Sequence, residues 1–164
     1  AGATGKTSEA AIRTFYDLPD EAILDMGDFV GGMLKYLRKN PVDHISICGG
    51  FAKLVKLAQG HLDLHSSRSQ VDFDRLAQTV KHCGGNAMLQ DATRTANTAK
   101  QVLEQCQAAN VDIADTIARQ ACESARATLD GATVVEIVIT DRDGKIIARH
   151  SPGDFDTFRP SVKK

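Results

Sequence analysis

The sequence predicts an α/β fold, a layered sheet with helices on its faces, and three observations support this prediction. The apolar segment 44–48 is followed at once by Gly49-Gly50 and a helical pattern, which together form a strand–helix unit. The β-branched segment 133–140 predicts a further strand. Asp141-Arg142-Asp143-Gly144 then predicts a tight hairpin, because Asp-Gly tolerates positive φ angles. We therefore expect a Rossmann-like domain that ends in a β-hairpin.

The remaining elements follow from apolar residues at helical spacing and from polar or glycine-containing breaks. In the first part of the chain, we expect a helix from about Ser8 to Leu18-Pro19, a short turn that Asp20 caps, and a helix that ends at Asn40-Pro41 and has Phe29, Val30, Met33, Leu34 and Leu37 on one face. A helix over 51–59 and a polar loop over 60–69 follow. We then expect three or four helices over 72–129, with breaks near Gly84-Gly85, Asn97 and Asn110, and a returning strand over 145–149. These elements form one domain over 1–150, and we expect the tail 151–164 to be loosely ordered.

A loop, Thr4-Gly5-Lys6-Thr7-Ser8-Glu9, precedes the first helix, and Thr7 or Ser8 can cap that helix. The sequence indicates no strand before this loop, although a glycine loop that opens a helix normally follows a strand in α/β folds. Two interpretations stay open: the chain is cut from a larger protein just after a strand, or the loop is free at a natural N-terminus.

The composition is that of an ordinary globular domain. The 164 residues are 42% hydrophobic and 25% charged, and 20 basic against 21 acidic residues give a net charge of -1. This balance gives no reason to expect a nucleic-acid or membrane-surface partner, and no apolar run approaches the roughly 20 residues of a membrane span. The four cysteines show no Cys-x-x-Cys spacing, so we expect reduced thiols in a cytoplasmic protein.

Three glycine-containing segments are candidates for ligand binding, because glycine lets a ligand approach the backbone closely. The segment from Gly5 to Glu9 opens a helix whose N–H groups can receive an anion, although the spacing of a nucleotide-hydrolysing P-loop is absent. The segment 26–32 contains Asp28, which can accept hydrogen bonds from an ammonium group or a ribose hydroxyl. Gly49-Gly50 stands where ligands of open α/β sheets bind. A plain capped helix or close helix packing is the alternative interpretation.

Charged side chains follow the last of these glycine segments. Lys53 and Lys56 share a helix face and are suited to hold carboxylates, with a solvated basic face as the alternative. The next loop is dense in ionisable and hydroxyl side chains, namely His61, Asp63, His65, Ser66 and Arg68. We interpret it as a substrate-binding or proton-handling loop. A metal site at its histidines and Asp63 is a weaker interpretation because further ligands are missing, and a polar surface loop is another alternative.

Three blocks of sequence, TGKTSE, LPDEAILDMGDFVGGMLKYLRK and ISICGGFAKLVKLAQGHLDLHS, resemble the C-terminal half of the CbiD family. The specific part of the resemblance is the block from Gly49 to Ser66, and the whole match runs from about residue 4 to about residue 149. Family members are more than twice as long, so the resemblance implies a missing N-terminal domain. The chain departs from the family pattern at Gly49-Gly50, where many members have Gly-His, and at Asp63, where others have Thr or Asn. These departures weaken a catalytic role for those positions.

The resemblance implies S-adenosylmethionine-dependent methylation of cobalt-precorrin-5B at C1, which gives cobalt-precorrin-6A in anaerobic cobalamin biosynthesis. Cobalt arrives inside the substrate, so no protein metal site is implied. Methyl transfer from a sulfonium requires alignment more than acid–base chemistry, so we expect binding residues rather than a catalytic triad. The expected cofactor-binding residues are Gly5, Thr7, Ser8, Glu9, Gly27, Asp28, Gly31, Gly49 and Gly50. The expected substrate-binding residues are Lys53, Lys56, His61, Asp63, His65, Ser66 and Arg68.

Two other classes of function stay open. The chain can be a non-catalytic tetrapyrrole- or nucleotide-binding module, or an interaction domain that docks another protein surface. The expected partners are cobalt-precorrin-5B and the missing N-terminal domain, with no nucleic acid and no membrane, and the sequence leaves homo-oligomer formation open.

Overall fold

The structure, a computed structural model, describes residues 1–152. The tail expected over 151–164 therefore lies almost entirely outside the described residues. Within the described part, none of the helices is long and apolar enough to pass through a membrane.

A five-stranded mixed sheet forms the centre of the described chain, with the strand order β2-β1-β3-β4-β5. The strands are β1 (Gly2–Ala3), β2 (Leu24–Asp25), β3 (His44–Gly50), β4 (Val134–Thr140) and β5 (Ile146–His150). The first four strands run parallel, and β5 returns antiparallel to β4 after the Asp-Gly turn. This arrangement confirms the predicted α/β fold and its final hairpin.

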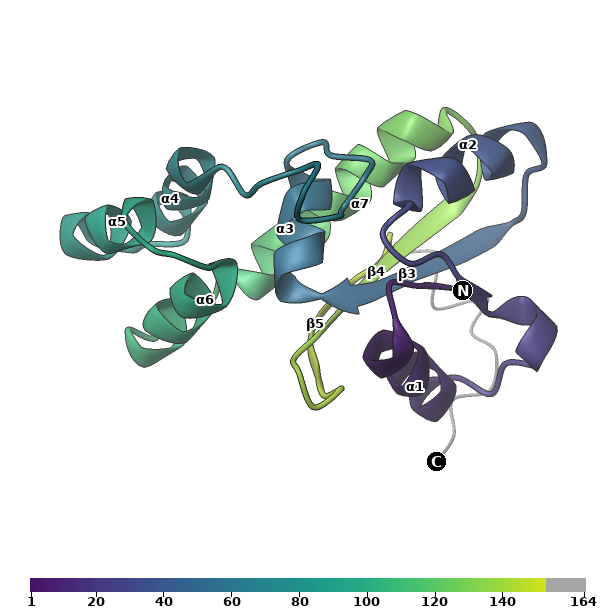
Figure 1. Ribbon diagram of the computed structural model, residues 1–164, viewed down its shortest axis with the longest axis horizontal. Coiled ribbons are helices and arrows are strands. Elements are labelled where there is room, and N and C mark those ends of the chain that lie inside the picture. Colours follow the sequence, from purple (N-terminus) through teal and green to yellow (C-terminus); the bar gives the residue numbers. More distant parts are fainter. Residues whose placement is uncertain (153–164) are drawn as a thin grey trace.

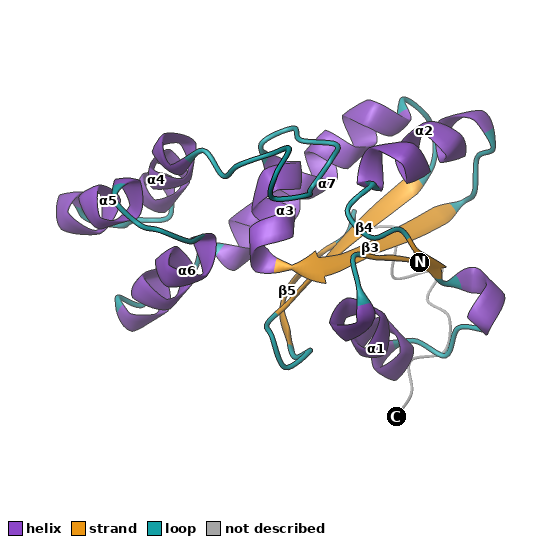
Figure 2. Ribbon diagram, viewed as in Figure 1, coloured by secondary structure: helices purple, strands orange, loops and turns teal. Residues whose placement is uncertain are grey.

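Helices cover both faces of the sheet, as Figures 1 and 2 show. They are α1 (Lys6–Phe15), α2 (Val30–Lys39), α3 (Phe51–Ala58), α4 (Phe73–His82), α5 (Ala87–Arg94), α6 (Ala99–Ala108) and α7 (Ala114–Leu129), with a 3-10 turn at Asp20–Ala22. Helix α1 lies on one face, whereas α2, α3 and α7 lie on the other. Helices α4, α5 and α6 gather beyond α3 at one end of the molecule. Four helices therefore occupy the region 72–129, with breaks close to the predicted ones.

The larger apolar core lies between the sheet and α2, α3 and α7. Alanines of α7, including Ala118, Ala121 and Ala125, are fully buried, and their small side chains let this helix lie close to the sheet. The smaller core lies under α1 and includes Ile12 and Tyr16. The alanine-rich composition thus belongs mainly to the face that α7 covers.

A buried carboxylate interrupts the smaller core. Glu136 of β4 is fully buried, and its oxygens accept hydrogen bonds from Tyr16 Oη at 2.7 Å and Ser46 Oγ at 2.6 Å. Arg149 Nε lies 2.5 Å from the same carboxylate. These partners explain why an acidic residue is tolerated inside a β-branched central strand, since a buried charge requires pairing. Nothing in the sequence pattern alone indicated this cluster.

The structure corrects the predicted start of the chain. Gly2–Ala3 forms a strand between β2 and β3, so the expectation of no strand before the first loop was wrong. Helix α1 begins at Lys6 after Gly5, without a side-chain cap from Thr7 or Ser8. The Ser8 hydroxyl instead donates to the Gly5 carbonyl at 2.8 Å. Two-residue strands carry too little periodicity to be recognised in a sequence.

Three smaller differences concern α2 and its neighbours. Phe29 precedes α2 and is 57% exposed, so it does not join the apolar face that Val30, Met33, Leu34 and Leu37 form as predicted. The segment after the 3-10 turn contains strand β2, which was not predicted. Gly49-Gly50 continues β3 rather than ending it, because the two glycines pair with Ile139 and Thr140 of β4.

All four cysteines are free thiols, as expected from their spacing. Burial raises the pKa of Cys48 to about 12 and that of Cys106 to about 11. Both thiols therefore stay protonated and unreactive at neutral pH.

Candidate functional site

The sheet topology places a ligand crevice at the carboxyl ends of β1 and β3. The chain leaves β1 for α1 on one face of the sheet and leaves the adjacent β3 for α3 on the opposite face. Neighbouring strands whose connections diverge in this way leave a crevice outside their carboxyl ends, where open α/β sheets bind ligands. Two of the three predicted glycine segments, at Gly5 and at Gly49-Gly50, lie at the carboxyl ends of these same strands.

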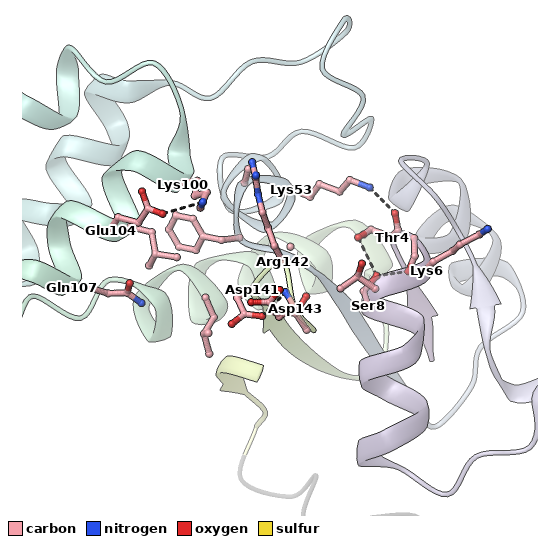
Figure 3. Close-up of a pocket in the computed structure, with 18 residues that line it drawn as sticks. Thr4, Lys6, Ser8, Lys53, Lys100, Glu104, Gln107, Asp141, Arg142 and Asp143 are labelled. Atoms are coloured by element: carbon pink, nitrogen blue, oxygen red, sulfur yellow. Dashed lines mark hydrogen bonds and ion pairs between the residues drawn. The ribbon is translucent and has the colours of Figure 1, made fainter. Parts of the chain in front are cut away.

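A cleft of about 790 Å³ lies at this edge. Four parts of the chain line it: the start of α1, the start of α3, helix α6, and the turn between β4 and β5 (Figure 3). The lining residues are 4–8, 50–53, Lys100, Leu103, Glu104, Gln107, 140–143 and Ile147. Parallel strand ends thus supply three walls, and α6 supplies the fourth.

The loop after β1 shapes one wall through its backbone. Gly5 has φ 153°, a conformation that favours glycine, and it is the N-terminal flanking residue of α1 with no side-chain cap. The first N–H groups of α1 are therefore left without a side-chain acceptor. Thr7 and Ser8, both predicted site residues, line the cleft beside them.

Gly50 precedes α3 as Gly5 precedes α1, and it also lines the cleft. It flanks the helix with no side-chain cap, and a Cβ atom built at Gly50 would meet no atom within 4 Å. Its neighbour Gly49 differs, because a Cβ there would lie 2.3 Å from Leu54 Cδ2 and 2.9 Å from Thr4 Cγ2. Gly50 is thus open, whereas Gly49 allows β1, β3 and α3 to pack closely.

Lys53 connects three loops at this edge. Its ammonium donates to the Thr4 carbonyl at 2.5 Å and lies 3.1 Å from Asp28 Oδ1 (Figure 3 shows the contact with Thr4). Thr4 follows β1, Asp28 follows β2, and Lys53 follows β3. The predicted residues Asp28 and Lys53 therefore meet one another, and Lys53 also lines the cleft.

The opposite wall was not predicted. Lys100 and Glu104 of α6 form an ion pair at 3.0 Å, and Arg142 and Asp143 project from the hairpin turn. The position of the hairpin could have been predicted from the sequence, since a turn that follows a parallel strand must lie at the carboxyl edge of the sheet. The position of α6 beside the cleft could not, because it depends on how the α4–α6 group packs against the rest of the domain.

The polar loop over 61–69 lies outside this cleft and largely satisfies its own side chains. Arg68 donates to Asp63 at 2.8 Å, and His65 Nδ1 lies 2.7 Å from Ser67 Oγ. The Arg68 hydrogen bond holds the pKa of Asp63 below its usual range. Ser66 is exposed in the same loop.

Backbone contacts attach this loop to the start of α2. Leu64 N–H donates to the Asp28 carbonyl at 2.8 Å, and Gly31 N–H donates to the Leu62 carbonyl at 2.9 Å. A Cβ at Gly31 would lie 2.6 Å from Leu62 Cβ, so this glycine serves close packing here. The predicted residues of the two segments are therefore neighbours, although they do not line the cleft.

Four further predicted residues lie away from the cleft. Lys56 is 6% exposed, and its ammonium donates to the carbonyls of Leu64 and Ser69. Burial lowers the pKa of this ammonium. Glu9 pairs with Arg13 on α1 at 2.9 Å, and Gly27 adopts φ 54° in the turn after β2. His61 N–H donates to the Lys56 carbonyl.

Within residues 1–152, no group of three or more His, Cys, Asp or Glu side chains is placed to hold a metal ion. The alternative metal site at His61, Asp63 and His65 therefore gains no support from the structure.

Comparison with known proteins places the chain in a family. The family model described as CbiD, C-terminal domain, matches residues 63–151. The chain belongs to the CbiD family. Its curated relatives include proteins named cobalt-precorrin-5B C(1)-methyltransferase from Brucella ovis, Brucella canis and Brucella melitensis biotype 1. Each is 58% identical over 149 residues, which cover 90% of this chain and 40% of the relative.

The chain therefore spans about two-fifths of the length of these curated relatives. No solved structure matches it. The cleft and the loops described above thus belong to one part of a longer family architecture.

Proposed function

We propose that this chain forms part of an enzyme that methylates cobalt-precorrin-5B at C1 to give cobalt-precorrin-6A, with S-adenosylmethionine as methyl donor. The observation that carries the proposal is the 58% identity to relatives named for this reaction. The cleft at the carboxyl ends of β1 and β3 supports it, because this edge is where open α/β sheets bind ligands. The proposed location is the cytoplasm, and the proposed partner is the remainder of the family architecture.

The backbone of the cleft fits the carboxylate and hydroxyl groups of such a donor. Both α1 and α3 begin here without side-chain caps, and Gly50 leaves open space where a side chain would stand. Uncapped N–H groups at helix starts favour anions. We assign the donor to this side of the cleft, with Gly5, Thr7, Ser8 and Gly50 in contact with it.

The chemistry requires positioning above all. S-adenosylmethionine supplies a methyl group already activated by its sulfonium. The protein groups hold the two reactants in line and exclude water, and no side chain of the cleft is required as a general base for the transfer itself. This role suits a cleft whose donor side consists of backbone N–H groups and hydroxyls.

The macrocycle carries many carboxylates, and we assign parts of its periphery to the 61–69 loop. His65 and Arg68 are exposed there, and the Leu64 N–H of the same loop donates to the carbonyl of Asp28, the ion-pair partner of Lys53. His65→Ala in the full-length enzyme should raise the KM for cobalt-precorrin-5B several-fold, because one charge-assisted or neutral hydrogen bond contributes about 1 kcal/mol. Unchanged KM and kcat would remove this loop from the site.

Calorimetry of the full-length enzyme with S-adenosylhomocysteine tests the donor site directly. Gly50→Ala should weaken binding about tenfold, since its methyl group enters the cradle at the start of α3. Gly32→Ala is the matched control, because a Cβ at this exposed helical glycine also meets no atom within 4 Å but lies on α2. Equal binding by both variants would remove Gly50 from the donor site. Binding without methyl transfer by the full-length protein would favour the non-catalytic module.

A further inference from the structure

The ammonium of Lys53 is already engaged by the protein on two sides. It contacts the Thr4 carbonyl at 2.5 Å and Asp28 Oδ1 at 3.1 Å. The side chains of Lys53 and Asp28 are 35% and 24% exposed, so solvent screens their attraction only in part. One hydrogen bond and one ion pair therefore hold this ammonium against the protein.

These contacts fix the loop that shapes the donor side of the cleft. Thr4 precedes Gly5, and its N–H donates to the Cys48 carbonyl of β3 at 3.0 Å. The Thr4 carbonyl is the point at which Lys53 attaches this loop to α3. Asp28 in turn accepts the Leu64 N–H through its backbone carbonyl, so the same pair also adjoins the 61–69 loop.

Other cations of the cleft are differently placed. Lys100 pairs with Glu104 across one helical turn. Lys6 and Arg142 also line the cleft, and neither has an ion-pair partner among residues 1–152. Cations without internal partners are better suited than Lys53 to meet carboxylates of a ligand.

We propose that Lys53 is a positioning residue that acts with Asp28 to hold the Thr4–Gly5 backbone in place, rather than a counter-ion for a substrate carboxylate. This inference rests on the proposed methyl transfer for its kinetic consequence. The two roles predict opposite effects at Asp28. If Lys53 is a counter-ion, removing the charge of Asp28 frees its ammonium for the ligand, and binding is kept or tightened. If Lys53 and Asp28 act as a positioning pair, the same change breaks their contact and weakens binding.

The experiment is a double-mutant cycle in the full-length enzyme with Lys53→Met, Asp28→Asn and both together. Lys53→Met keeps the apolar stem, and Asp28→Asn keeps the shape while removing the charge. Each single variant should weaken S-adenosylhomocysteine binding and lower kcat about tenfold, because small displacements of a reacting group are costly. The double variant should be no worse than the more damaging single variant, since both changes break one contact.

A second measurement does not depend on the proposed reaction. Amide hydrogen exchange of residues 4–9 should become faster in both single variants, while α6 and α7 stay unchanged. Lys53→Arg, which retains a charged donor, should restore part of the protection and part of the affinity. Lys81→Met is the control and should change neither readout, because Lys81 is an exposed lysine of α4, a helix that does not line the cleft.

Three results would overturn the proposal. In the first, Asp28→Asn leaves binding unchanged or tightens it while Lys53→Met raises only the KM for cobalt-precorrin-5B. In the second, the losses of the two single variants add in the double variant. In the third, exchange over residues 4–9 is unaffected by either change.

If the wild-type enzyme fails to bind S-adenosylhomocysteine, the proposed donor site is wrong, and hydrogen exchange alone decides the role of Lys53. Asp28→Asn serves as the informative variant if Lys53→Met does not fold.

Discussion

The helices that begin at the carboxyl edge of the sheet start differently from those in the α4–α6 group. In the α4–α6 group, side chains cap each helix: Asp72 accepts from Arg75 N–H, Asn86 from Leu89 N–H, and Thr98 from Gln101 N–H. At the carboxyl edge, α1, α2 and α3 begin after Gly5, Phe29 and Gly50, and none has a side-chain cap.

This difference marks the starts of α1 and α3 as candidate binding starts, although α2 also lacks a side-chain cap and does not line the cleft. A cap satisfies N–H groups that otherwise lack partners, and it stabilises the helix. The α4–α6 group is capped where the chain needs stable helices. The starts of α1 and α3 lack caps at the place where a cleft lies, so no side chain accepts from their first N–H groups, and we propose that a ligand does. The density of ionisable residues pointed to the 61–69 loop, whereas the helix starts without side-chain caps point to the cleft.

The largest expected effect tests whether the carboxyl edge is closely packed despite its uncapped helices. Gly49→Ala should destabilise the protein by about 3 kcal/mol, because overpacking costs this order and its Cβ would overlap Leu54 and Thr4. Gly50→Ala should change stability by less than about 1 kcal/mol, since its Cβ meets open space. Urea unfolding of both variants measures the difference, and equal losses would contradict the close packing.

An intermediate effect tests the caps themselves. Thr98→Ala should lower the free energy of unfolding by about 1 kcal/mol, because its side chain caps α6. Thr7→Ala should have almost no effect, because Thr7 is exposed and does not cap α1. Thermal or urea unfolding of the two threonine variants compares them directly. A similar loss at Thr7 would mean that the helix starts do not differ.

The sequence predicted the strands and helices whose patterns extend over several residues. The α7 region, β4 and the Asp-Gly hairpin were found because their periodicity and turn residues are local signals. The predicted caps at Thr7 or Ser8 were wrong. Helix α1 begins at Lys6, before both residues, and the presence of a hydroxyl residue does not fix the position at which a helix begins. Strands β1 and β2 were missed because each has two residues and is held by its neighbours in the sheet.

The candidate site was predictable in part. The glycine loops at Gly5 and Gly50 line the cleft because the carboxyl ends of parallel strands share one edge. Lys53 and Lys56 were both predicted to hold substrate carboxylates. In the structure their ammonium groups contact Thr4, Asp28 and Leu64, which come from other loops. Tertiary contacts of this kind leave no trace in the spacing of the residues themselves.

The smallest expected change in stability is also the sharpest test of the comparison. Gly50→Asp gives α3 a capping carboxylate, and the extended backbone of Gly50, with φ -67° and ψ 151°, suits a capping residue. A cap and a favourable charge at a helix start should raise stability by about 0.5 kcal/mol. The same carboxylate would occupy the space proposed for the donor and repel an anionic group, so S-adenosylhomocysteine binding to the full-length enzyme should be lost. A variant that is more stable and still binds normally would show that the missing cap at Gly50 is not reserved for a ligand.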